Sequence, residues 1–359
     1  MKIALSGMPR RSLLIAFGIA LVALFTFRLR AFWRPFIFSP KKGDRPPSRP
    51  NAFKEGDKVS VGIVHGGDIE KMVREAINLI GGVETLDVLG KAVLLKPNIV
   101  SGALSPATTN PRVVRAVTKI LYEAGARQVF VGDMSAFIKL PTRKNMENSF
   151  IKTMAEEAGA KLVPFEEGGW VSVATPQGQY VKKVYVAEIL YQVDRIINLP
   201  VIKTHRSATY SIALKNFVGA THFRQRPFLV DRNHWEEVIA ELNLAYTPDL
   251  HIVDGTRIMV EGGPWEGKPV EANLVIATGD RIAAEVVGLG VLKHYSELPQ
   301  IKDVDVWEQR QVKRAVELSL GVKGEDQIEF LEKELAPEIP GFNGVLRTIR
   351  REVLREEVE

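Results

Sequence analysis

The chain alternates short runs of consecutive apolar residues with longer stretches whose apolar residues recur at the spacing of an amphipathic helix. Several short runs contain only Val, Ile and Leu, which is typical of parallel strands covered on both faces. The predicted strands are 59–64, 92–95, 128–131, 161–163, 195–199, 250–253 and 272–277. The predicted helices are 69–80, 111–124, 146–158, 235–245, 281–292, 306–320 and 342–358. This order predicts a three-layer α/β fold, with a mostly parallel sheet and helices on both faces.

The clearest local prediction is the β-α-β unit from Ala92 to Val131. Asn110 offers a side chain that can cap the first helical turn, and Pro111 suits the first helical position. Gly125 suits the turn that follows the helix. The capping residues therefore agree with the apolar periodicity on where this helix begins and ends.

A different pattern occupies the amino-terminal end. The 16 residues between Arg11 and Arg28 carry no charge, and an aromatic and basic stretch follows them up to residue 38. Such a segment is typical of a single membrane-spanning helix whose flanking arginines and aromatics reach the interface. We expect residues 1–38 to act as an anchor, inserted through residues 12–38, with a secretory signal peptide as the alternative. Basic residues flank both ends of this segment, so the charges do not determine on which side of the membrane the rest of the chain lies.

The rest of the chain divides into three predicted parts. Residues 39–57 contain four prolines and are expected to form an extended linker. Residues 58–340 are expected to form one α/β domain. Residues 341–359 are expected to form a terminal helix whose arginines are balanced by glutamates.

Charge and cysteine content narrow the function. The chain has 359 residues, 48 basic and 43 acidic, with a net charge of +5. Eight of the basic residues and none of the acidic ones lie in the first 42 positions, so the body is weakly acidic and nucleic acid is not an expected partner. The absence of cysteine excludes disulfides, thiolate nucleophiles and Cys-ligated iron–sulfur clusters or zinc. No cofactor and no oligomeric state can be identified from the sequence.

Polar residues follow five of the predicted strands. In an open parallel sheet the carboxyl ends of the strands meet at one edge, where ligands bind. The residues in question are Lys96, Asn98, Asp133, Lys203, Thr204, His205, Asp254 and Asp280. Any one of them alone could be a cap or turn residue, and Asp280 is expected to cap the helix that begins at residue 281. We expect the others to contribute to a site at this edge.

The densest group of such residues lies between 199 and 222. It contains Lys203, Lys215, His205, His222 and Asn216, which are cationic and hydrogen-bonding donors suited to a carboxylate or phosphate. A lysine among apolar neighbours has a lowered pKa and can act as a base, and a histidine can move protons near neutral pH. We therefore take Lys203, His205 and Lys215 as catalytic candidates, with a solvated charged surface as the alternative.

The remaining candidates would hold the ligand. The predicted ligand-binding residues are Lys96, Asn98, Asp133, Thr204, Asn216, His222, Asp254, Gly262 and Gly263. The two glycines lie in a stretch similar to a phosphate-binding loop, but Pro269 replaces the Ser or Thr that such a loop requires. They would serve backbone approach to a ligand or a tight turn. No close pair of histidines indicates a metal site; a metal bound by a dispersed set such as His205 and Asp133 is the less favoured alternative.

Several motifs in order resemble the domain of unknown function 362 family. They are Leu94-Leu-Lys-Pro-Asn98, Thr109-Asn-Pro111, Gly132-Asp133, Asn198-Leu-Pro-Val-Ile-Lys-Thr-His205, Ala213-Leu-Lys-Asn216, and Asp254-Gly255 ahead of Glu261-Gly-Gly-Pro264. The resemblance covers about residues 58–300 and implies a shared fold and a shared site, but no established activity. Some members are similar to ferredoxins in an added Cys-rich segment, which this chain lacks. A weaker similarity links the helix start at Thr109 to nickel-dependent lactate racemases, without the histidine pattern expected for their cofactor.

Two function classes follow from the clustered donors. The first is a membrane-anchored enzyme that acts on a small anionic ligand at the carboxyl edge of the sheet. The second is a non-catalytic module that binds a ligand or cofactor at the membrane. A third, a scaffold that contacts lipid through the terminal helix, does not explain why polar residues gather at strand ends.

Overall fold

The computed structural model describes residues 39–44 and 49–357. The predicted anchor at residues 12–38 lies outside the described residues. Within these two ranges, no helix is both long enough and apolar enough to cross a membrane.

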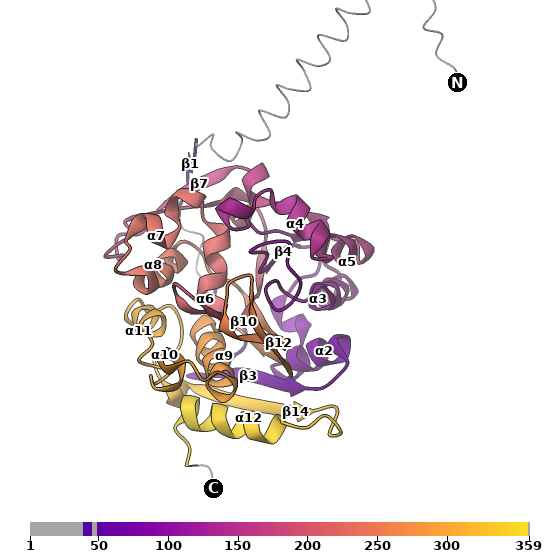
Figure 1. Cartoon of the computed structure of the whole chain (residues 1–359). Coiled ribbons are helices and arrows are strands. Elements are labelled where there is room, and N and C mark those ends of the chain that lie inside the picture. Colours follow the sequence, from indigo (N-terminus) through magenta and orange to yellow (C-terminus); the bar gives the residue numbers. More distant parts are fainter. Residues whose placement is uncertain (1–38, 45–48, 358–359) are drawn as a thin grey trace, which may run out of the picture. The chain divides into compact units, whose positions relative to one another are not determined.

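One sheet of 11 strands organises the domain (Figure 1). Along its main path the strands are β14 (Ile328–Glu334), β3 (Lys58–His65), β13 (Gly267–Thr278), β12 (Leu250–Gly262), β9 (Arg195–Leu199), β4 (Ala92–Pro97), β5 (Gln128–Val131) and β6 (Lys161–Leu162). The run from β12 to β6 is parallel throughout, and β14 is parallel to β3. Only β13, among the strands of this path, is antiparallel to its neighbours. The predicted α/β class is confirmed.

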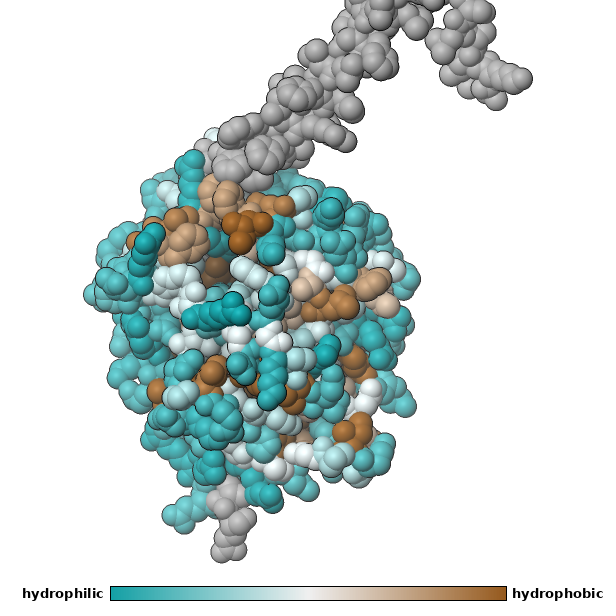
Figure 2. All heavy atoms as spheres, viewed as in Figure 1, coloured by the Kyte–Doolittle hydropathy of each residue, from teal (hydrophilic) through white to brown (hydrophobic). Residues whose placement is uncertain are grey.

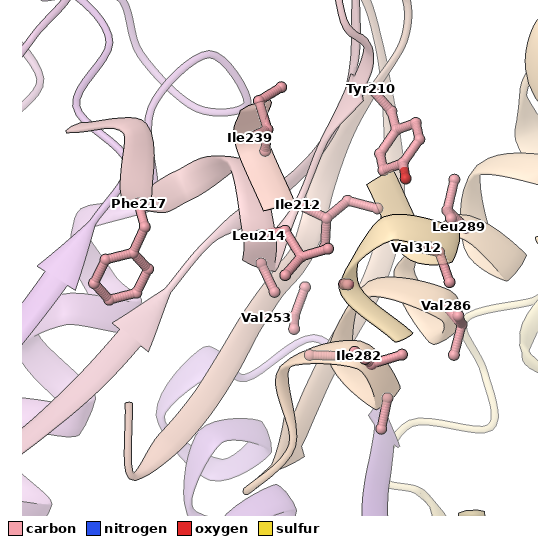
Figure 3. Packing of buried hydrophobic residues seen from close by; sticks show 14 of the residues in the cluster. Tyr210, Ile212, Leu214, Phe217, Ile239, Val253, Ile282, Val286, Leu289 and Val312 are labelled. Atoms are coloured by element: carbon pink, nitrogen blue, oxygen red, sulfur yellow. The ribbon is translucent and has the colours of Figure 1, made fainter. Parts of the chain in front are cut away.

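Helices pack on both faces of the sheet because neighbouring strand residues point to opposite sides. Val93 and Leu95 of β4 belong to one apolar core, together with α2 (Ile69–Leu79), α3 (Pro111–Glu123) and α5 (Ile151–Glu157). Leu94 belongs to the other core, which contains α8 (Trp235–Leu242), α9 (Arg281–Tyr295), α11 (Arg310–Glu317) and α12 (Phe342–Ile349). Figure 3 shows this second core, where Ile282, Val286 and Leu289 of α9 lie among residues from the strands and from other helices.

Two helix starts agree with the capping residues in the sequence. The Asn110 side chain accepts a hydrogen bond from the Arg112 backbone N–H at 3.0 Å, and α3 begins at Pro111. Asp280 accepts from the backbone N–H groups of the first turn of α9, so its expected role as a cap is confirmed. Because β13 is antiparallel, Asp280 lies at the edge opposite to the carboxyl ends of the parallel strands.

Several boundaries differ from the expected ones. The predicted helix 146–158 is two helices, α4 (Thr142–Asn148) and α5, separated at Phe150, which has a left-handed φ of 62°. The predicted helix 306–320 is shorter, because only α11 is helical there. The predicted strand 250–253 continues to Gly262 as part of a long hairpin with β13.

The predicted linker and terminal helix both pack onto the domain. Phe53 is buried, Arg49 forms an ion pair with Asp249 at 2.5 Å, and β2 (Lys54–Glu55) pairs with β3. At the other end, Val345 and Ile349 of α12 are buried in the core. Residues 49–57 and 342–354 therefore belong to the folded body, because their apolar side chains complete its core.

Some strands gave no clear signal in the sequence. A separate three-stranded sheet consists of β1 (Lys41–Lys42), β7 (Trp170–Ala174) and β8 (Lys183–Ala187). The stretch after Leu199 forms β10 (Val201–His205), which is parallel to β12, and β11 (Thr209–Ser211). The pairing of β9 with β4 thus ends at Leu199, and after Pro200 the chain continues as β10 beside β12. Lys203 therefore lies beyond the end of β9.

Candidate functional site

A cavity of about 300 Å³ lies beyond the carboxyl ends of β4, β5 and β10. Six of the predicted site residues line it: Asn98, Asp133, Lys203, His205, Lys215 and Asn216. They come from the loops after β4 and β5, from β10, and from the short helix α6 (Ala213–Asn216). Segments more than 100 residues apart in the chain therefore meet at this edge, as the parallel arrangement of the strands requires.

A buried ion pair forms the floor of the cavity. Lys96 Nζ lies 2.6 Å from Asp133 Oδ1, and both side chains are almost fully buried. The other carboxylate oxygen of Asp133 accepts a hydrogen bond from the Ile99 backbone N–H at 2.6 Å. Burial lowers the pKa of Lys96, and the Asp133 carboxylate opposes that effect. Lys96 does not line the cavity itself, but it pairs with Asp133, which does.

Lys203 is enclosed by neutral oxygen atoms. Its Nζ donates to Asn98 Oδ1 at 2.9 Å, to the Ala107 carbonyl at 2.6 Å and to the Pro264 carbonyl at 3.1 Å. An ammonium group has three N–H bonds, so all of them are used within the protein. Burial, and then the charge of Lys215, lower the pKa of Lys203 well below its usual value. Lys203 thus contributes charge to the cavity without a free donor.

Two asparagine side chains link these lysines. Asn98 Nδ2 donates to Asn216 Oδ1 at 3.1 Å, and Asn98 Oδ1 accepts from Lys203. Asn216 Nδ2 donates to the Lys96 carbonyl at 3.0 Å and to Asn198 Oδ1 at 2.7 Å. Each amide is held in one orientation by partners on both sides, so the floor is rigid.

Lys215 has a different environment. It is half-buried and lines the cavity, yet its Nζ makes no hydrogen bond or ion pair with any residue in the described part of the chain. Burial, and then the nearby Arg226 guanidinium, lower its pKa to about 7. Lys215 therefore offers an unshared amine that gains and loses a proton near neutral pH.

His205 lines the cavity as a neutral imidazole. Its Nδ1 accepts hydrogen bonds from the backbone N–H groups of Ser207 and Ala208 at 3.1 and 3.2 Å. Burial, and then the charges of the two lysines, lower its pKa well below the usual value. A neutral ring whose Nδ1 accepts carries its proton on Nε2. His205 can therefore donate one hydrogen bond to a ligand without adding charge.

Arg226 was not predicted from the sequence, and it adds a further buried cation. Its guanidinium donates to the carbonyls of Val218, Met134 and Ser135, and its buried Nε has no partner in the described structure. Burial lowers its pKa to about 10, which leaves it charged at neutral pH. Arginines are common in solvated loops, so no local pattern around residue 226 distinguishes it from those.

The charges around the cavity are unequal. Lys203, Lys215 and Arg226 line it, whereas Asp133 is the single lining carboxylate in the described structure. That carboxylate is already paired with Lys96. The cavity therefore contains an excess of positive charge in a place largely withdrawn from water.

Apolar side chains complete the cavity wall. They are Val100, Met134, Ala136, Phe137, Ile138, Val218, Pro227, Phe228, Trp235, Pro264 and Trp265. None was predicted as a site residue, because an aromatic or aliphatic residue in a loop has the same local pattern whether it lines a cavity or packs in a core. Pro264 and Trp265 reach the cavity through the turn between β12 and β13.

Besides Lys96, five predicted ligand residues do not line the cavity. Thr204 points to the opposite side of β10 from its neighbours Lys203 and His205, as strand alternation requires. Asp254 accepts from the Asn110 backbone N–H at 2.7 Å and so holds the start of α3. Its predicted position was wrong because β12 continues beyond it instead of ending there.

His222, Gly262 and Gly263 have structural roles. His222 accepts from the Arg224 backbone N–H at 3.3 Å, and its ring lies edge-on to Trp170. Gly262 and Gly263 both have positive φ, and a Cβ on Gly263 would lie 2.0 Å from the Thr204 carbonyl oxygen. The glycines make the tight turn that brings Pro264 over Lys203, as the alternative interpretation of this stretch expected.

His205 and Asp133, two of the dispersed residues considered as metal ligands, both line the cavity, but no third ligand joins them among the described residues. In residues 39–44 and 49–357, no group of three or more His, Cys, Asp or Glu side chains could hold a metal ion.

The comparisons with known proteins bear on this same region. The family described as a domain of unknown function (DUF362) matches residues 93–290, which is more than half of the chain. The chain belongs to the DUF362 family. The resemblance deduced from the motifs is thereby confirmed, and all of the cavity-lining residues fall within the stretch that matches DUF362.

Individual proteins are also similar to this chain. A thylakoid-associated protein of Synechocystis sp. is 29% identical over 234 residues, which cover 63% of this chain and 71% of that protein. The lactate racemase apoprotein from Thermoanaerobacterium thermosaccharolyticum has 13% identity and a TM-score of 0.40, over 67% of this chain and 58% of its own. A protein from Thermotoga maritima has 14% identity and a TM-score of 0.37, over 59% and 56%. This DUF362 chain spans less than two thirds of either solved structure.

Proposed function

We propose that this protein binds a small anionic ligand, a carboxylate or a phosphate, in the cavity and catalyses a proton transfer on it. One observation carries the proposal: three cationic side chains line the cavity, and the single lining carboxylate in the described structure is already paired with Lys96. A buried charge is costly unless an opposite charge or hydrogen bonds compensate it. An anion in the cavity would supply that compensation.

The position of Lys215 supports catalysis in addition to binding. Its amine has no protein partner in the described structure and a pKa of about 7, so both protonation states are populated near neutral pH. A group with such a pKa can take a proton from a bound ligand and return it. His205, held neutral, would donate a hydrogen bond to the ligand as charge develops on it.

A non-catalytic binding module is the second candidate, and Lys203 favours it. Because all three of its N–H bonds are used within the protein, Lys203 can supply a fixed positive field but no proton relay. A field of this kind is sufficient for binding. The two candidates differ in whether a bound anion exchanges a carbon-bound proton with solvent in a manner that depends on Lys215.

Binding of simple anions to the full chain tests the proposal. The probes are inorganic phosphate and short carboxylates such as acetate and succinate, followed by calorimetric titration. We expect Lys215→Met to weaken binding by about tenfold or more, because a charge-assisted contact contributes ~1.5–3 kcal/mol. Lys71→Met, at a lysine whose side chain is 78% exposed, is the matched control and should bind as the wild type does. Equal binding by all three proteins would contradict the anion site.

We also propose that the protein associates with a membrane. Two observations support this: the uncharged stretch within residues 12–38, and the name of the Synechocystis relative, which describes that protein as thylakoid-associated. Alkaline washing of membranes from cells that express the full chain tests it. Recovery in the washed membranes would support an anchor, and recovery in the supernatant would contradict one.

A further inference from the structure

We propose that the ligand is an amphiphile, with an anionic headgroup in the cavity and an apolar body that leaves through its mouth. This inference rests on the proposed anion site and specifies its substrate class. It comes from how the lining residues are distributed by depth: the charged ones are buried or half-buried, whereas the large lining side chains that are exposed are apolar.

The charged lining residues are buried, apart from Lys215, which is half-buried. Lys203 is 1% exposed, Asp133 3% and Arg226 8%. An anionic headgroup that reaches them must enter a narrow, largely dry space, where its contacts with the cations are strengthened. The cavity of about 300 Å³ has room for a headgroup and a short connected segment, but not for a long body.

Three large apolar residues of the lining are exposed and mark the opening of the cavity. Phe137 is 40% exposed and Ile138 73%, in the 3-10 helix η3 (Phe137–Lys139). Phe228 is 41% exposed, and its neighbour Leu229 is 54% exposed, in α7 (Pro227–Val230). Two elements about 90 residues apart thus present large apolar side chains at one opening. Figure 2 shows apolar surface over the region where Figure 1 labels α7.

Two tryptophan side chains also belong to the cavity wall. Trp265, from the turn between β12 and β13, lines the cavity, and Lys139 Nζ lies over its ring at 5.1 Å from the centroid. Trp235 lines the cavity as well and lies 5.9 Å from the ring of Phe228. An apolar chain that extends from the headgroup would contact these rings and cover the exposed aliphatic residues, which removes apolar surface from water.

A series of alkyl carboxylates tests the inference on the full chain. The probes are hexanoate, octanoate and decanoate, each below the concentration at which it forms micelles, with acetate as the headgroup alone. We expect the affinity to rise by roughly two- to fourfold for each added CH₂ until the mouth is covered. Decanol, which has the same chain without the charge, should bind much more weakly than decanoate.

Variants at the mouth separate the chain from the headgroup. The double variant Ile138→Ser and Leu229→Ser should flatten the chain-length series while acetate binding stays unchanged. Leu89→Ser is the control, because Leu89 is 76% exposed but pairs with Ala126 just before β4 and β5, at the edge of the sheet opposite to the cavity. It should leave the series as it is in the wild type.

The possible outcomes distinguish this inference from the proposed function. If all the carboxylates bind wild type with the affinity of acetate, the amphiphile is contradicted and the anion site stands. If decanol binds as tightly as decanoate, the cationic floor does not select the headgroup and both proposals fail. If the serine variant changes self-association or vesicle binding but leaves the series intact, the apolar mouth contacts a second copy or a bilayer and the inference is overturned.

Discussion

Lys203 and Lys215 line the same cavity, but their ammonium groups have opposite surroundings. Lys203 Nζ donates to three protein oxygens between 2.6 and 3.1 Å away, whereas Lys215 Nζ has no hydrogen-bond or ion-pair partner within the described residues. From the sequence, both lysines were predicted to be catalytic candidates. The structure separates a lysine that holds the site together from one that is available to a ligand.

Replacing each lysine with methionine should therefore have different consequences. Lys203→Met leaves three buried oxygen acceptors without a donor, and we expect a loss of ~2–4 kcal/mol in the free energy of unfolding. Lys215→Met removes a half-buried cation without a partner, and the stability at neutral pH should stay the same or rise. Urea unfolding of both variants and the wild type measures this. Equal losses of stability in the two variants would show that Lys215 also has a structural partner.

The ion pair between Lys96 and Asp133 on the cavity floor should require a glycine at position 219. A Cβ at this position would lie 2.0 Å from Asp133 Oδ1 and 3.0 Å from Lys96 Nζ. Gly219→Ala must therefore displace the carboxylate, and we expect it to cost ~1–3 kcal/mol of stability and to weaken anion binding. Gly168→Ala is the matched control, because a Cβ there would lie an ordinary 3.6 Å from the Phe165 carbonyl oxygen. Similar thermal unfolding of the two variants would argue against a tight floor.

Glu285 provides a prediction on pH. It accepts from the Leu214 backbone N–H at 2.8 Å, and burial raises its pKa to about 8. In the folded protein the Glu285 carboxyl keeps its proton up to about pH 8, whereas in the unfolded chain it releases that proton near its ordinary pKa of 4.5. The wild type should therefore lose stability as the pH rises from about 4.5 to about 8. Glu285→Gln mimics the protonated acid and should remove that slope while leaving stability at about pH 5 within ~1 kcal/mol.

Chemical denaturation across this pH range measures the slope for both proteins. A Glu285→Gln variant that is strongly destabilised at low pH would mean that the wild-type carboxylate is ionised and paired. The same slope in both proteins would show that Glu285 does not titrate in the folded state as described.

Much of the fold follows from local patterns in the sequence. The strands Gln128–Val131 and Arg195–Leu199 have the predicted boundaries, because short runs rich in apolar residues end at Gly132 and Pro200. The strand β14 was missed because its side chains are mostly exposed or half-buried and it is held by its parallel pairing with β3. The direction of β13 was missed as well, since an apolar run has the same pattern in either direction.

Residues of the candidate site that follow a strand end could be predicted from the sequence. Residues that only the tertiary fold brings to the cavity could not. Asn98 and Asp133 were found because each directly follows a buried parallel strand. Asp254 satisfied the same rule but lies inside a longer strand, and its carboxylate serves α3. Arg226 and Trp265 reach the cavity from loops whose course depends on the whole fold, so local sequence contains no signal for them.

Lys215 is the titrating cation proposed to meet an anion, and the pH dependence of carboxylate binding tests this most directly. Acetate keeps its charge above about pH 5, so any change at higher pH comes from the protein. Because the pKa of Lys215 is about 7, its charge is present below that pH and lost above it. We expect acetate affinity of the wild type to fall by about tenfold between about pH 6 and pH 9. Lys215→Arg, which stays charged, should bind without that decline, and Lys215→Met should bind weakly at every pH. A wild-type affinity that does not change with pH, or the same decline in all three proteins, would contradict the central claim.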